Sequence, residues 1–494
     1  MLWIQAFLIA ILVCFLTLHF LKHLWTHRRY PPGPLPLPVI GGLWRTRFGV
    51  SLDTFTKLAK QYGKIYTIWT GPVPVVVLSG FQAVKEGLIN HSDDFSGRPA
   101  TSLIKATFQE RGILFSNGHI WKQHRRFGLI TLRKLGLGKK GIEHRIKEEA
   151  QQLVETFAQA NGQPLDPSLP ITNSICNVIS VLTFGQRFSP EDEDFQKLVK
   201  AIAFLQKFGG SVPQILYDMF PWLMKHLPGP HKKALSLFEV MHSFAKKELE
   251  KHKEHQTVHD PQDFIDFYLL EMEKEAKNDP NSTYEEENLA QCIIDFFAAG
   301  TETTATTLQW ALLLMATHPD IQEKVHKEIE DVFGSSCLIY YQDHKKLPYT
   351  NAVIHEIQRS NYVFLFGIPR QTEKDVNMQG FHIPKGTLIV PDLHSVLLDP
   401  EQWETPEKFN TNHFLDMDGR FMAREEFLAF GAGDRACVGE QLARVELFIF
   451  FTSLLRAFTF QLPAGIKELS LVPALGLTAH PQPYKLCAIP RCST

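Results

Sequence analysis

The chain has 494 residues, of which 44% are hydrophobic and 21% charged, so it is long enough for one large domain or several small ones. Its formal net charge of −2 argues against nucleic acid as a partner. The seven cysteines lie far apart, except for Cys487 and Cys492. This wide spacing excludes a disulfide framework and favours a reducing compartment.

Residues 2–21 form an almost continuous apolar run, in which only Gln5, Thr17 and His19 are polar. As a helix, this run would span about 30 Å, the thickness of one hydrocarbon core. A signal peptide would carry a basic residue before the run, but here the basic residues follow it, beginning with Lys22. Residues 1–21 are therefore predicted to be an uncleaved transmembrane anchor, with the rest of the chain on the cytosolic side.

Residues 22–46 are first basic and then rich in proline. Proline restricts the backbone to extended conformations and makes a semi-rigid spacer. A generic linker or an SH3 ligand has a similar composition. The position directly after a predicted anchor favours a hinge that sets the body against the membrane.

Residues 47–494 contain no internal repeat and no break in composition, which predicts a single body. Strand-like patterns cover residues 64–79 and 375–391. The longest helical patterns cover four runs, 141–162, 235–256, 284–317 and 439–458. The expected fold class is mainly α with a smaller β portion.

The stretch 204–230 is unusually apolar and also contains Lys207, Lys225 and Trp222. Two interpretations have equal weight. The stretch is either buried core or a segment that enters the membrane interface, where Trp and Lys are favoured.

Inside the helical run 284–317, residues 298–304 read AAGTETT. Small side chains thin one side of a helix, so a large planar group could pack closely against it. Thr303 can bond back to a carbonyl one turn earlier, or instead hold water in a bend. Glu302 is suited to handling protons. The alternative is an ordinary back-bonded or exposed threonine.

The ten-residue segment FGAGDRACVG places Cys437 at the start of another helical run. A thiol there faces unpaired N–H groups and the positive end of a helix dipole, which both favour the thiolate. Glycines let the backbone approach a large flat object, and Arg435 supplies a cation. A haem iron with an axial cysteine requires these features. A buried, inert cysteine is the alternative.

This segment resembles the haem-binding signature of the cytochrome P-450 superfamily through Phe430, Gly433, Arg435, Cys437 and Gly439. The resemblance covers essentially the whole chain. Two positions depart from the common pattern, because Gly431 stands where many relatives have serine and Asp434 is acidic where a basic residue is common.

The resemblance implies a cytochrome P-450 fold behind one N-terminal transmembrane helix, with haem b as the cofactor and Cys437 as the metal ligand. Glu302 and Thr303 match the oxygen-activation motif and would be catalytic, by delivering protons. The implied cofactor-binding residues are Cys437, Arg98, Trp121, Arg125, Arg370, Arg435, Phe430, Gly439 and Ala299.

Glu356 and Arg359 are spaced as neighbours on a helix, where such a pair is usually a weak surface contact. Their spacing also matches the superfamily's Glu-x-x-Arg element. The resemblance places them in a buried network whose third member comes from residues 406–414. There, His413 stands where many relatives have arginine.

The runs 284–290, 347–359 and the sequence after Cys437 are similar to vertebrate microsomal family 2 enzymes, most of all the J subfamily. This implies a monooxygenase in the endoplasmic reticulum membrane that hydroxylates or epoxidises lipophilic substrates, such as polyunsaturated fatty acids (arachidonic acid among them) and xenobiotics. Electrons would come from NADPH through a flavoprotein reductase, with cytochrome b5 as a further candidate donor. The basic residues around Lys122 and Arg133 are either a solvated face or a docking face for an acidic electron donor.

By family position, Phe115, Phe296, Phe297, Val363 and Leu365 are candidates for contact with a substrate, with ordinary core packing as the alternative. Two other functions stay open. The same fold could act as a hydroperoxide isomerase or dehydratase, or the chain could be a non-catalytic, anchored haem-binding protein.

Overall fold

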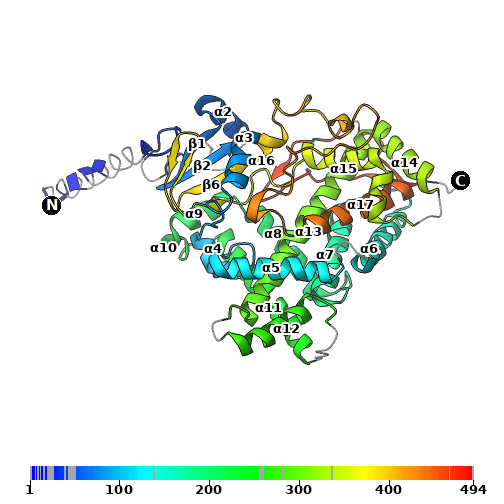
Figure 1. Cartoon of the computed structure of the whole chain (residues 1–494), viewed down its shortest axis with the longest axis horizontal. Coiled ribbons are helices and arrows are strands. Elements are labelled where there is room, and N and C mark those ends of the chain that lie inside the picture. The colour runs from blue at the N-terminus through cyan, green and yellow to red at the C-terminus, as the bar shows by residue number, and fades with distance from the viewer. Residues whose placement is uncertain are drawn as a thin grey trace.

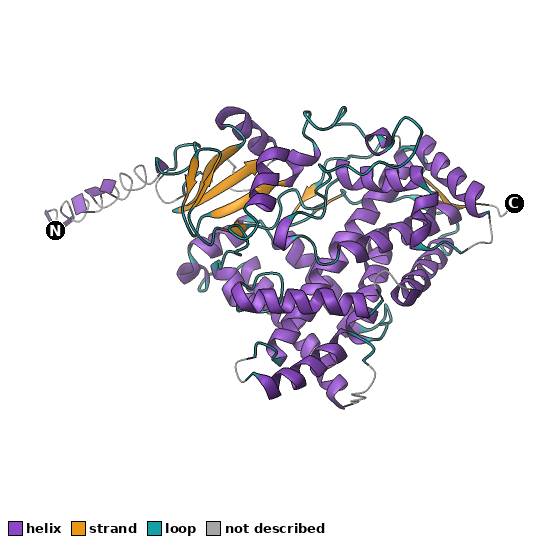
Figure 2. Cartoon of the chain, in the orientation of Figure 1, coloured by secondary structure: helices purple, strands orange, loops and turns teal. Residues whose placement is uncertain are grey.

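The computed structural model describes residues 27–37, 40–42, 52–136, 140–254, 261–279, 282–334, 338–466 and 468–491, with scattered positions between 3 and 18. Helices make up most of the molecule, and the larger sheet lies at one end (Figures 1 and 2). The expectation of a mainly α body with a smaller β portion is confirmed.

The helices follow the predicted runs closely, since the expected 141–162, 235–256, 284–317 and 439–458 correspond to α6, α11, α13 and α17. The α-helices are α2 (Leu52–Tyr62), α3 (Phe81–Lys85), α4 (Ser102–Phe108), α5 (Gly118–Lys134), α6 (Lys140–Ala158), α7 (Ser168–Phe184), α8 (Glu193–Phe208), α9 (Val212–Met219), α10 (Pro221–Met224), α11 (Pro230–Glu254), α12 (Phe264–Asn278), α13 (Glu286–Thr317), α14 (Pro319–Phe333), α15 (Pro348–Ser360), α16 (Leu393–Leu397) and α17 (Glu440–Ala457). Short helices of other types are the π-helix η1 (Glu86–Asn90) and the 3-10 helices η2 (Tyr341–Lys346), η3 (Thr411–Phe414) and η4 (Gly433–Arg435).

The larger sheet has four strands in the order β1-β2-β6-β3. β1 and β2 form an antiparallel hairpin, β2 runs parallel to β6, and β3 runs antiparallel to β6. Three two-stranded pairs complete the β portion, namely β4 with β5, β7 with β10 and β8 with β9. The strands are β1 (Ile65–Thr70), β2 (Val73–Ser79), β3 (Arg370–Gln371), β4 (Val376–Met378), β5 (Phe381–Ile383), β6 (Leu388–Asp392), β7 (Phe458–Gln461), β8 (Ala474–Leu475), β9 (Ala479–His480) and β10 (Cys487–Pro490).

Helix α13 runs through the middle of the helical part and contacts α7, α8, α11, α14, α15 and α17 (Figure 1). Most of its residues are buried, as expected for a helix that is apolar on almost every side. The main hydrophobic core forms around it and α17. Ala299 is an exception, because it is exposed in the middle of this buried helix.

The predicted anchor, residues 1–21, lies largely outside the described residues and stays a prediction. Within the part of the chain that the structure describes, no helix has the length and hydropathy needed to cross a membrane.

The apolar stretch 204–230 is partly buried and partly exposed. Tyr217 and Met224 are buried in a small separate core that also contains Leu103, Phe208 and Ala234. In contrast, Trp222 on α10 is 66% exposed, and Leu223 and Leu227 beside it are exposed as well. One face of this stretch therefore packs inward, while the other presents large apolar side chains to solvent.

Candidate functional site

The segment before α17 is folded tightly onto the rest of the body. The Cys437 N–H donates to the Phe430 carbonyl at 2.9 Å, and the Asp434 N–H donates to the Ser92 hydroxyl at 2.7 Å. Gly433 has a positive φ of 71°, and a Cβ at this position would clash with the Leu88 carbonyl oxygen. Only glycine fits there, because both the backbone conformation and the space exclude a side chain.

Cys437 is exposed to solvent, although many protein atoms lie around it. Burial raises the pKa of its thiol to about 11, against the opposing effects of the Gly439 N–H and the charge of Arg125. The Gly439 N–H favours the thiolate, as the helix start predicts, but desolvation of the thiol outweighs it. A metal ion would reverse this balance, since a coordinating thiol is deprotonated outright.

Three arginines gather near this segment, and each of them is buried. Arg98, Arg370 and Arg435 are 4%, 5% and 7% exposed. Within the described part of the chain, the hydrogen bonds of Arg98 and Arg435 end on uncharged oxygen atoms, including the Leu114, Ile368, Pro369, Ser96 and Ser116 carbonyls. Burial, and then the charges of the neighbouring arginines, lower the pKa of Arg98 well below its usual range.

Two buried donors at this cluster have no partner among the described residues, the Nε atoms of Trp121 and Arg370. The Arg435 guanidinium also lies over the Trp121 ring, with its central carbon 3.8 Å from the centroid of the ring. Arg125 lies at the edge of the cluster, where it donates to the Ala436 carbonyl at 2.7 Å. Buried cations that repel one another, together with unpartnered donors, fit a ligand with carboxylate groups.

The residues Glu302, Thr303 and Thr304 point in three directions from α13, because successive side chains on a helix are about 100° apart. The Thr303 hydroxyl donates back to the Ala299 carbonyl at 2.8 Å. The Thr304 hydroxyl donates to Glu446 of α17 at 3.1 Å. Glu302 points instead toward β9. The predicted catalytic residues therefore sit side by side in the chain without a direct contact between their side chains.

Glu302 has a partner that sequence reasoning missed. Its Oε1 lies 3.0 Å from Nε2 of His480 on β9. Thr306, one turn along α13, contacts the other ring nitrogen of His480 at 3.2 Å. Burial raises the pKa of Glu302 and lowers the pKa of His480. No local pattern could reveal this pair, because its two residues come from distant parts of the chain.

The predicted network around Glu356 and Arg359 is confirmed. Arg359 binds Glu356 through two bonds, Nε to Oε2 at 2.7 Å and a terminal nitrogen to Oε1 at 2.8 Å. His413 is the third member, with Nδ1 3.1 Å from Glu356 Oε2. The other ring nitrogen of His413 accepts the Thr405 N–H at 3.3 Å, so the neutral Nδ1–H tautomer satisfies both contacts.

Of the remaining predicted residues, some lie near Cys437 and others lie in the hydrophobic core. Phe430 lies under the Arg444 guanidinium at 4.8 Å, and Gly439 caps α17. Phe297 is buried in the main core against Phe184. Core packing is therefore the right interpretation of Phe297. Val363 and Leu365 are also buried, whereas Phe115 and Phe296 are partly exposed.

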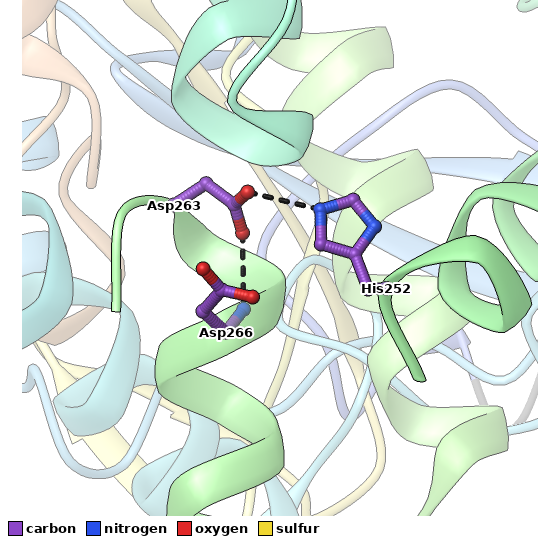
Figure 3. Close-up of side chains that lie close together, drawn as sticks. All are labelled: His252, Asp263 and Asp266. Atoms are coloured by element: carbon purple, nitrogen blue, oxygen red, sulfur yellow. Dashed lines mark hydrogen bonds and ion pairs between the residues drawn. The ribbon is translucent and has the colours of Figure 1, made fainter. Parts of the chain in front are cut away.

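Apart from this site, one group among the described residues has the composition of a metal site, His252 with Asp263 and Asp266 at the start of α12 (Figure 3). Its polar atoms already have partners. His252 Nε2 lies 2.9 Å from Asp263 Oδ2, and Asp263 Oδ1 accepts the Asp266 N–H at 3.0 Å. Asp266 in turn accepts the Gln262 N–H. The group is a helix cap closed by a histidine, and its geometry indicates a structural role.

Comparison with known proteins agrees with this site. The family model described as Cytochrome P450 matches residues 31–488. Cytochrome P450 2J2 of Homo sapiens is 43% identical over 464 residues, which cover 94% of this chain and 92% of the relative. Cytochrome P450 2J1 of Oryctolagus cuniculus is 41% identical over the same shares of the two chains.

Relatives outside the J subfamily are similar over comparable lengths. Cytochrome P450 2C23 of Rattus norvegicus is 41% identical over 98% of each chain. The haem-thiolate cofactor of this family agrees with the donors found here, a cysteine beside buried arginines that form no ion pair with a carboxylate in the described part of the chain. The chain therefore belongs to the cytochrome P450 family, as a monooxygenase similar to members of the 2J and other family 2 subfamilies.

Proposed function

We propose that the chain inserts one oxygen atom into lipophilic substrates at a haem held by Cys437 and the arginine cluster. The observation that carries this proposal is the set of buried guanidinium groups, Arg98, Arg370 and Arg435, with Trp121 Nε1 unpartnered beside them. Two propionates would neutralise the cluster and accept the unpartnered donors. When bound, the haem supplies the redox chemistry of oxygen insertion, which the thiolate ligand favours.

The residues of the chain provide the surroundings of that chemistry. Ala299 is exposed on α13, most of whose residues are buried, and leaves room for a flat group. The Thr303 hydroxyl lies one turn further along the same helix. Glu302 is the buried carboxyl next to it, and its raised pKa lets it hold a proton near neutral pH. We assign proton delivery to Glu302 and Thr303 together.

Polyunsaturated fatty acids, such as arachidonic acid, and lipophilic foreign compounds are the proposed substrates. The resemblance to the J subfamily supports the fatty acids. Two exposed apolar surfaces support a lipid-side approach. One surface is at Trp222 and Leu223 on α10, and the other is the β8–β9 hairpin, where Leu475 and Leu477 are 44% and 46% exposed. The hairpin is joined to the end of α8, because the Leu477 N–H donates to the Gln206 carbonyl at 2.8 Å.

We further propose the endoplasmic reticulum membrane as the location, with the body on the cytosolic side and residues 1–21 as the anchor. An NADPH-dependent flavoprotein reductase would supply electrons, with cytochrome b5 as a second donor. Exposed basic side chains on α5, including Lys122, Arg126 and Arg133, support an acidic partner on that face.

Reconstitution of the full chain with haem, reductase and NADPH tests the function. A panel of fatty acids, steroids and drugs should give hydroxylated or epoxidised fatty acids, with product formation dependent on both NADPH and dioxygen. Product from a fatty-acid hydroperoxide without NADPH would favour the isomerase or dehydratase. Loss of fatty-acid products alone would remove the substrate proposal and leave the monooxygenase in place.

Cys437→Ser is the matched variant for the ligand. Its reduced form should lose the carbon monoxide spectrum that a thiolate ligand gives. Retention of that spectrum would contradict the assignment of Cys437.

A further inference from the structure

The closest polar partner of Glu302 is His480, which the assignment of proton delivery does not use. The two residues belong to different elements, α13 and β9, and their side chains meet at 3.0 Å. Glu302 is only 8% exposed at its side chain, whereas His480 is 19% exposed. The histidine therefore stands between a buried carboxyl and water.

The position of His480 is fixed from both sides of its strand. The neighbouring Ala479 donates its N–H to the Val363 carbonyl at 2.8 Å. The Ala479 carbonyl accepts the indole N–H of Trp310, on α13, at 2.9 Å. Because the backbone is held by α13 itself, the ring of His480 is fixed relative to Glu302.

Every polar atom of the imidazole faces a group that can exchange a proton. Nε2 lies near Glu302 Oε1 and also 2.8 Å from the Thr478 hydroxyl. Nδ1 lies 3.2 Å from the Thr306 hydroxyl, which in turn lies 3.5 Å from Glu302 Oε1. The neutral tautomer with its proton on Nδ1 satisfies this arrangement, since Nε2 then accepts the proton of the Glu302 carboxyl.

We propose that His480 is a positioning residue for Glu302, which aims its carboxyl and connects it to water for proton exchange. The proposal rests on the proposed role of Glu302 in proton delivery. After Glu302 has given up its proton, Nε2 takes a proton from a hydronium ion of the solvent, which leaves water, and the ring becomes an imidazolium. The Nε2 proton then passes to Oε1, which restores the neutral ring and the protonated carboxyl.

The charges around the pair define its pH dependence. Lys207, exposed on α8, is the charged side chain that acts on both partners, because it favours the Glu302 carboxylate and disfavours the His480 imidazolium. Burial opposes the effect of Lys207 on Glu302, because burial disfavours the carboxylate. On His480, burial adds to the effect of Lys207, because both disfavour the imidazolium. Both effects on His480 keep the imidazolium short-lived, as a relay requires.

His480→Gln tests the proposal, because glutamine keeps a hydrogen bond and cannot titrate. His382→Gln is the matched control, since His382 also lies on a two-stranded hairpin but is 51% exposed at its side chain and lies beside Asp375 instead of Glu302. The first measurement needs no turnover. The infrared carboxyl band of Glu302, assigned by its loss in Glu302→Gln, is followed after transfer of the holoenzyme into D₂O.

Exchange of this band should slow by about tenfold or more in His480→Gln and stay unchanged in His382→Gln. The second measurement is the fraction of NADPH electrons recovered in product across the pH range. It should fall by about three- to tenfold in His480→Gln and lose its dependence on pH.

A purely structural role predicts a different outcome, in which His480→Gln lowers the melting temperature while the exchange rate and the pH profile remain those of the wild type. That outcome would overturn the proposal. His480→Asn serves as the second variant if His480→Gln does not retain haem. If no substrate is turned over at all, the proposed function fails, and the infrared exchange still decides the role of His480.

Discussion

At the scale of single residues, the protein buries several charged side chains, and these differ in the partners that they have. Arg359 is paired with Glu356, and His252 is paired with Asp263. Arg370 is different, since its buried Nε has no partner among the described residues. A buried donor without a hydrogen-bond partner is costly. Such a residue therefore indicates a ligand site, whereas the paired residues indicate structure.

The pair of His252 and Asp263 gives a pH-dependent contribution to stability. Burial opposes the charged histidine, but the hydrogen bond and the charge of Asp263 outweigh burial and raise the pKa of His252 to about 9 from its ordinary 6.5. The contribution is therefore fully present below pH 6.5 and is lost as the pH rises through about 9.

His252→Gln should lower the free energy of unfolding by about 1 to 3 kcal/mol below pH 6.5, and by much less above pH 9. Urea unfolding of both proteins at the two ends of this window measures the difference. His382→Gln, which removes a histidine with a 51% exposed side chain, is the control. An equal loss at both ends would mean that the ion pair contributes no pH-dependent stability.

At the scale of elements, α15 is tied to the loop before η3 through one buried guanidinium. Besides its two bonds to Glu356, Arg359 donates to the carbonyls of Leu397, Pro406 and Lys408. Glu356 also accepts the Asn410 N–H at 2.7 Å. This fork of donors explains why the position holds arginine, because lysine could not reach several fixed acceptors at once.

Glu356→Gln should lower the free energy of unfolding by about 3 to 5 kcal/mol, since it leaves Arg359 buried without its counter-charge. Glu148→Gln is the matched control. It removes the carboxylate of the pair Arg145 and Glu148, which has the same spacing. The two side chains are 57% and 43% exposed, so the substitution should lower the free energy of unfolding by about 0 to 1 kcal/mol. Thermal or urea unfolding compares the two variants. Similar losses would show that burial of the pair does not set its contribution.

At the scale of the whole molecule, the proposed donor-docking face and the proposed lipid-facing surfaces lie on different elements. Lys122, Arg126 and Arg133 are exposed on α5, whereas Trp222 and Leu223 are exposed on α10, and Leu475 and Leu477 on the β8–β9 hairpin. An acidic electron donor and a lipid surface could therefore bind without competing for the same residues.

Reversal of the charges at Lys122 and Arg133 to glutamate should slow reductase-driven turnover, with the largest effect at low salt, because electrostatic steering is screened by ions. Turnover driven by peroxide should not change. Lys200→Glu, an exposed position on α8, is the control. An equal loss in the two assays would show that the substitutions damage the site and not the docking of a reductase.

The sequence alone determined the features that depend on local patterns of residues. Periodicity placed α6, α11, α13 and α17, and the residue types at 430–439 pointed to a thiolate site, whereas the buried ion pair at 356–359 was implied by the resemblance to the cytochrome P-450 superfamily. Only the tertiary structure decided what depends on surroundings. It showed that burial raises the pKa of Cys437, that Phe297 is core, and that Glu302 meets His480. The physical reason is that desolvation and long-range contacts depend on which distant segments pack together, and no spacing within one segment encodes that packing.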